Sequence, residues 1–110
     1  LDRLVELAPK IPDGTVLLVV REDRWSRPSR VTHMGLVVEG RGGGRALRHA
    51  SDVPGALRVR DEPLEAFARR FARQPWKVVG VSLYRVPDNR ARAEALLGQD
   101  AGRADGVRDR

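Results

Sequence analysis

The order of apolar and polar residues predicts a β-hairpin near the middle of the chain. Residues 33–39 and 45–50 are rich in apolar and β-branched side chains, and the glycine-rich segment 40–44 separates them. Two strands joined by a short glycine turn pair antiparallel. The pattern therefore predicts an antiparallel sheet, whose other strands would be residues 15–20, 57–60 and 76–86.

Two segments have the spacing of an amphipathic helix. The first covers residues 1–8, where apolar side chains recur every three or four positions, and it ends at Pro9. In the second, we expect Asp61 to cap a helix that Glu62 and Pro63 open. The apolar stripe of this second helix would consist of Leu64, Phe67, Ala68 and Phe71.

Together these elements indicate an α+β fold, in which a short helix packs on an antiparallel β-sheet. A chain of 110 residues is long enough for one compact domain with a small core. We assign residues 1–87 to this domain, because the apolar content falls sharply beyond Pro87. Residues 88–110 are predicted to contain a short helix at 91–97, followed by a disordered tail from Gly98.

The charge of the chain bears on its partners. The formal net charge is +6, and all but two of the 21 basic side chains are arginine. Such a charge suits an anionic partner such as nucleic acid. The arginines are spread through strands, loops and tail, however, and only 5% of the residues are aromatic, so few side chains are present to stack on bases. A nucleic-acid partner is therefore not expected.

Membrane insertion and cysteine chemistry are not supported within these residues. The longest apolar run, residues 16–20, is far too short to cross a bilayer, so we expect no membrane span. No leader-like segment is visible, and any targeting segment is expected upstream of Leu1. The chain contains no cysteine, which excludes disulfides, thiolate metal ligands and a thiol nucleophile within it.

The two histidines, His33 and His49, lie at the open end of the predicted hairpin. Pairing about the glycine turn makes the numbers of opposite residues sum to an even value of about 82 to 84. The two histidine numbers sum to 82, which predicts that both imidazoles project from one face of the sheet as direct or diagonal neighbours. Two adjacent imidazoles suit nucleophilic catalysis, in which one takes a proton and the other fixes its orientation.

Other interpretations of the histidines and of nearby motifs remain open or have little support. The histidines could be ordinary hydrogen-bonded strand residues, and a zinc site would need further ligands from Glu39, Asp52 or Asp61. No serine lies in a Gly-x-Ser-x-Gly elbow. The glycine-rich segment 40–44 lacks the lysine and the following helix of a phosphate-binding loop. We predict neither a cofactor nor a metal.

Four short motifs resemble those of NlpC-type, papain-like cell-wall peptidases. The motifs are THMGLVV at residues 32–38, LRHAS at 47–51, V-x-D-x-x-L at 59–64 and G-V-x-L-x-R at 80–85. The chain is most similar to the amidase-like relatives within this group, a family of bacterial envelope proteins named for resemblance to N-acetylmuramoyl-L-alanine amidases. The resemblance extends over residues 11–85, with Thr15 standing where the family usually has aspartate.

The resemblance implies a role for each histidine. His33 would be the general base and later the general acid, and His49 would be the polar residue that orients it. The family's cysteine nucleophile begins a helix upstream of the strand pair, where the helix dipole and a nearby imidazole lower its pKa. The chain would then be the C-terminal, histidine-bearing half of a papain-like domain, inactive alone because its nucleophile-bearing part is absent.

The resemblance also implies a substrate and a location. The reaction would be hydrolysis of an amide bond in peptidoglycan stem peptides, in the cell envelope or outside the cell. A non-catalytic module that binds the cell wall or a protein is the main alternative, and an arginine-rich nucleic-acid binder is a weaker one. A half-domain would also expose a sheet face, so dimerisation through that face is predicted.

Overall fold

In the part of the chain that the structure describes, five strands form one antiparallel sheet. The computed structural model describes residues 1–51, 54–55 and 57–108, with side chains up to residue 100. The strand order is β4-β3-β2-β1-β5, so the two edge strands are β4 and β5. The strands are β1 (Thr15–Arg21), β2 (Val31–Glu39), β3 (Arg45–Ala50), β4 (Val59–Pro63) and β5 (Val78–Tyr84). The α+β class and the antiparallel sheet predicted from the sequence are confirmed.

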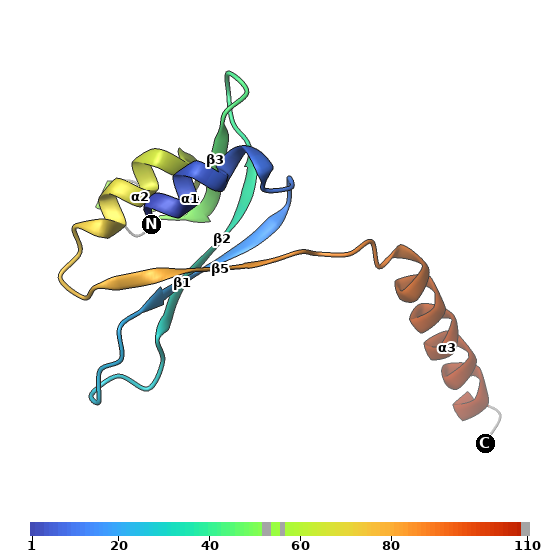
Figure 1. The fold of residues 1–110 in the computed structure, drawn as a ribbon. Coiled ribbons are helices and arrows are strands. Elements are labelled where there is room, and N and C mark those ends of the chain that lie inside the picture. The colour runs from blue at the N-terminus through green and yellow to red at the C-terminus, as the bar shows by residue number, and fades with distance from the viewer. Residues whose placement is uncertain (52–53, 56, 109–110) are drawn as a thin grey trace.

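Two helices cover one face of this sheet (Figure 1). They are α1 (Asp2–Leu7), which continues into a short 3-10 helix at Ala8–Lys10, and α2 (Leu64–Ala72). Alternate residues of the strands point toward the helices, and these residues form the core with the apolar stripe of α2. The largest fully buried side chains are Phe67, Leu17, Leu47, Leu64, Val19 and Val37.

The predicted hairpin is present, and its register follows from the glycine turn. Leu36 pairs with Arg48, and Val37 pairs with Leu47. Gly42 and Gly43 have positive φ angles of 83° and 90°, which glycine adopts without the steric cost of a side chain. The turn therefore fixes which residues of β2 and β3 face the helices.

The start of α2 differs from the prediction. Asp61 and Glu62 belong to β4, and α2 begins at Leu64 with no side-chain cap. Asp61 pairs with Arg48 in the register of β3 and β4, and its carboxylate accepts two hydrogen bonds from that arginine, at 2.9 and 3.0 Å. A bidentate arginine contact of this kind competes with the helix cap for the carboxylate. The short strand that the sequence predicts at residues 57–60 therefore continues as far as Pro63.

The C-terminal segment also differs from the prediction. Helix α3 runs over Arg90–Arg108, whereas the sequence predicts disorder from Gly98. Alanine, leucine, arginine and glutamate are strong helix formers. Their intrinsic preference explains why this segment is helical although it has no apolar face to bury. In Figure 1, α3 stands away from the sheet. The radius of gyration of 19.1 Å agrees, because a compact chain of this length would have about 13 Å.

In the part of the chain that the structure describes, no helix covers the second face of the sheet (Figure 1). Its outward-pointing side chains include Met34 and Tyr84, which are 58% and 56% exposed. Leu36 and Val59 are also exposed large hydrophobic residues of these strands. Dimerisation through an exposed sheet face stays a prediction, and it would involve these side chains.

Gly35 in β2 is predicted to be essential for the packing of the hairpin. A Cβ atom at this position would lie 2.7 Å from Leu47 Cδ1 and 3.0 Å from the carbonyl oxygen of Arg48. Because Leu47 is fully buried, it has little room to move away. We expect Gly35→Ala to lower the free energy of unfolding by about 1–3 kcal/mol, as measured by urea denaturation.

Gly80 in β5 provides the matched control. A Cβ atom there would meet nothing within 4 Å. Gly80→Ala should therefore leave the free energy of unfolding unchanged or raise it slightly, because alanine restricts the unfolded chain. Equal losses of stability in the two variants would refute the packing explanation.

Candidate functional site

The structure brings the two predicted site residues into direct contact. His33 Nε2 lies 2.7 Å from His49 Nδ1, within hydrogen-bond distance. The rings meet edge to face, with centroids 4.9 Å apart and planes at 88°. The residues are diagonal neighbours across β2 and β3, since opposite residues of this hairpin sum to 84. The predicted shared face is therefore confirmed.

The helices and the sheet together hold the two imidazoles. Both histidines project to the face that α2 covers, where the ring centroid of Phe71 is 5.5 Å from that of His33. The Phe67 ring stands edge-on to His49, with centroids 6.2 Å apart. His49 is only 4% exposed, whereas His33 is partly exposed. The inner imidazole is thus fixed by packing, and the outer one remains within reach of solvent.

A buried carboxylate, Glu62, completes the row of polar side chains. Its Oε1 lies 3.5 Å from His49 Nε2, and Glu62 is only 4% exposed. Arg70 of α2 donates two hydrogen bonds to this carboxylate, at 2.9 and 3.1 Å. Arg60 adds a longer contact at 3.4 Å. The row His33–His49–Glu62 therefore crosses three neighbouring strands, β2, β3 and β4.

Glu62 was missed as a site residue because the sequence assigned it to a helix start. Its position in β4 follows from strand alternation, since Arg60 pairs with His49 and Glu62 lies two residues further along the same face. Continuing the predicted strand at residues 57–60 by three positions would have placed this carboxylate beside the histidines.

Burial and charge shift the ionisation of the inner pair. Burial lowers the pKa of His49 below 6.5, an effect that the nearby Glu62 carboxylate opposes and the Arg70 and Arg60 guanidinium groups reinforce. Burial alone would raise the pKa of Glu62, but the hydrogen bonds and charge of Arg70 outweigh it and hold that pKa below 4.5. At neutral pH, His49 is therefore neutral and Glu62 is ionised.

Of the three residues considered as zinc ligands, the two that the structure describes do not join the histidines. Asp61 is on the opposite face of β4, bound to Arg48, and Glu39 ends β2 next to the glycine turn. Asp52 lies outside the described residues. Across residues 1–51, 54–55 and 57–100, no group of three or more potential ligands is arranged to hold a metal ion.

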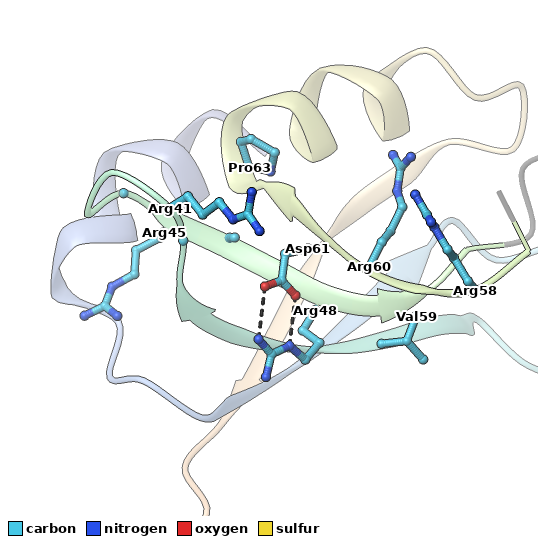
Figure 2. Close-up of a pocket in the computed structure, with 11 residues that line it drawn as sticks. Arg41, Arg45, Arg48, Arg58, Val59, Arg60, Asp61 and Pro63 are labelled. Atoms are coloured by element: carbon cyan, nitrogen blue, oxygen red, sulfur yellow. Dashed lines mark hydrogen bonds and ion pairs between the residues drawn. The ribbon is translucent and has the colours of Figure 1, made fainter.

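A hollow beside the outer face of β3 and β4 is lined by several arginines (Figure 2), and its lining does not include the histidines. It has a volume of about 690 Å³, and its lining contains Arg41, Arg45, Arg48, Arg58 and Arg60. Figure 2 shows that Arg48 is already bound to Asp61. Two others are also near carboxylates, Arg45 at 3.7 Å from Asp13 and Arg60 at 3.4 Å from Glu62. Much of the positive charge is therefore already compensated within the protein.

A buried arginine closes the end of the site near the loop between β1 and β2. Arg21 is 8% exposed, and its guanidinium group donates to Thr32 Oγ1 at 2.7 Å and to the carbonyl oxygen of Trp76 at 2.6 Å. The same group lies 5.7 Å from the centroid of the Phe71 ring, which packs against His33. Arg21 therefore ties the start of β2 and the segment between α2 and β5 to the histidine site.

Comparisons with known proteins leave the family open. No protein-family model, curated protein or solved structure matches this chain. Among the described residues, none of the helices has the length and apolar character needed to span a membrane. The NlpC-type resemblance therefore stays a prediction that depends on the chain's own residues.

Acidification is predicted to destabilise the fold. Because the pKa of His49 is below 6.5 in the folded protein, the unfolded chain binds more protons as the pH falls through 6.5. The lowered pKa of Glu62 acts in the same direction at more acidic pH, since protonation there loses its stabilising contacts with Arg70. We expect the free energy of unfolding, measured by urea denaturation, to fall steadily from about pH 7 to pH 4. If the free energy of unfolding stays level or rises over this range, the pKa values of His49 and Glu62 are not lowered as described.

Proposed function

We propose that His33 and His49 are the base and the orienting residue of a cysteine amidase or peptidase that hydrolyses amide bonds in peptidoglycan stem peptides. The observation that supports this proposal is the 2.7 Å contact between His33 Nε2 and His49 Nδ1. One imidazole is buried and packed, and the other is partly exposed. A reactive histidine needs both access to the substrate and a fixed partner, and this pair provides them.

In the proposed reaction, His33 moves the protons. It takes the proton from the cysteine thiol, and the thiolate attacks the amide carbonyl carbon. The imidazolium then gives the proton to the leaving amine as the carbon–nitrogen bond breaks, which leaves an acyl-thioester. His33 next takes a proton from water, whose oxygen attacks the thioester carbon. The carbon–sulfur bond breaks, and the imidazolium returns its proton to the sulfur, which releases the carboxylic acid and restores the thiol. Such a substrate implies a location in the cell envelope or outside the cell.

The thiol must come from outside the 110 residues, because they contain no cysteine. By themselves these residues provide the base and its support, and we expect them to show no amidase activity on muropeptides. The same absence of cysteine favours a second candidate, a module of this fold that binds wall peptides or a protein partner without cleaving them.

The intact protein from its native source distinguishes the two candidates. Its mass and its alkylation by iodoacetamide show whether an attached thiol exists, and chromatography of digested muropeptides measures hydrolysis. If the proposal holds, His33→Ala lowers kcat/KM by about 10²- to 10⁴-fold, the usual contribution of a general base. Binding to insoluble peptidoglycan should change little.

Met34→Ala is the matched control for this experiment. Met34 is next to His33 in β2 but points to the opposite, uncovered face, where it is 58% exposed. Its replacement should leave hydrolysis unchanged. Intact protein without an alkylatable thiol, or wall-peptide hydrolysis by the cysteine-free chain, would refute the cysteine mechanism; the first result, with peptidoglycan binding retained, would favour the binding module.

A further inference from the structure

We propose that Glu62 is a positioning residue that sets the tautomer of both histidines and thereby directs the basic nitrogen of His33 toward the substrate. The catalytic part of this inference, the direction of the basic nitrogen toward the substrate, rests on the proposed function. The physical claim, that one buried carboxylate fixes the protons of two imidazoles, concerns the 110 residues alone and can be tested on them.

The geometry of His49 gives the first step. Its Nε2 is buried, makes no hydrogen bond among the described residues, and lies 3.5 Å from the Glu62 carboxylate. An ionised carboxylate accepts hydrogen bonds and cannot donate them. A proton on His49 Nε2 is therefore stabilised by the negative charge, whereas a lone pair there would be repelled by it. A small movement of either side chain would turn this contact into a hydrogen bond.

The contact between the imidazoles carries the effect to His33. A neutral imidazole has one N–H donor and one acceptor nitrogen, so a proton on Nε2 of His49 makes its Nδ1 the acceptor. The group 2.7 Å from this acceptor is His33 Nε2, which must then donate its own proton. In neutral His33 the lone pair consequently lies on Nδ1. That nitrogen is the one turned away from His49, and the proposed mechanism requires it to take the proton from the thiol.

The surroundings keep Glu62 ionised. Arg70 of α2 binds it through two nitrogens, and Arg60 of β4 approaches to 3.4 Å. Among the described residues, the charged or titratable groups that face His49 are thus His33 from β2, Glu62 and Arg60 from β4, and Arg70 from α2. When His33 becomes an imidazolium, the carboxylate stabilises its positive charge through His49 in a site of low dielectric constant.

A merely structural role for Glu62 leads to a different expectation. If Glu62 only ties Arg70 to the sheet, its replacement changes stability but not the positions of the histidine protons. In Glu62→Gln, an amide oxygen at the Oε2 position keeps the hydrogen bonds from Arg70 Nε and from Arg60. The amide NH₂ group then takes the Oε1 position, which faces His49, and the bond from Arg70 Nη2 is lost. His49 Nε2 then becomes an acceptor, and the tautomers of both histidines reverse.

Nitrogen-15 NMR of the imidazoles of the 110-residue chain at neutral pH tests this directly. In the wild-type chain we expect protonated Nε2 and unprotonated Nδ1 in both histidines, and in Glu62→Gln the opposite for both. The matched control is Asp61→Asn, which removes the same charge one residue earlier on the outer face, where Asp61 binds Arg48. The control should keep the wild-type tautomers.

Replacement of Arg70 gives an independent measurement if Glu62→Gln does not fold. Arg70→Gln removes a positive charge and leaves the carboxylate to His49, so the apparent pKa of the histidine pair should rise by about one unit or more with unchanged tautomers. A proton on Nδ1 of wild-type His33, unchanged tautomers in a folded Glu62→Gln, or no rise in pKa in Arg70→Gln would each overturn the proposal.

The two proposals fail in different experiments. If the NMR results are as expected but the intact protein carries no thiol, Glu62 sets the tautomers of a non-catalytic pair and the cysteine mechanism is wrong. If the intact protein hydrolyses wall peptides and Glu62→Gln reverses the tautomers, kcat should fall with little change in KM. An unchanged kcat in that variant would show that the tautomer does not matter to the reaction.

Discussion

The burial of an ionised carboxylate is the constraint on which the site depends. Removing Glu62 from water is costly unless its charge is paired and its oxygens are hydrogen-bonded. Arg70 meets this requirement from α2, and His49 approaches the same oxygen from β3. The carboxylate therefore fastens the helix to the sheet at the place where the imidazoles lie. Breaking this pairing would leave an uncompensated charge in the core.

The aromatic side chains of α2 make the rest of this arrangement rigid. Phe67 and Phe71 have ring centroids 4.4 Å apart, and each packs against one imidazole. The same two residues belong to the main apolar cluster, which includes Leu17 and Leu47. The orientation of the histidines therefore depends on the same side chains as the packing of the core. A rearrangement of α2 would move the base as well as the core.

The sequence was sufficient for the parts of the structure in which local signals agree. The glycine turn fixes the register of the hairpin, and the parity of residue numbers then places His33 and His49 together. It was insufficient at β4, where a helix-start pattern conflicts with strand pairing. Long-range contacts of Asp61 with Arg48 and of Glu62 with Arg70 favour the strand there. Such contacts have no signal in a short window of sequence.

The close packing of Gly35 against Leu47 links two motifs that look independent in the sequence. Gly35 is two residues after His33, and Leu47 is two residues before His49, so each histidine has one member of this contact in its own strand. The space for the leucine exists only because the glycine has no side chain. In related chains, a larger residue at position 35 would have to be accompanied by a smaller one at position 47. Positions 35 and 47 would thus covary in those chains that also have the two histidines.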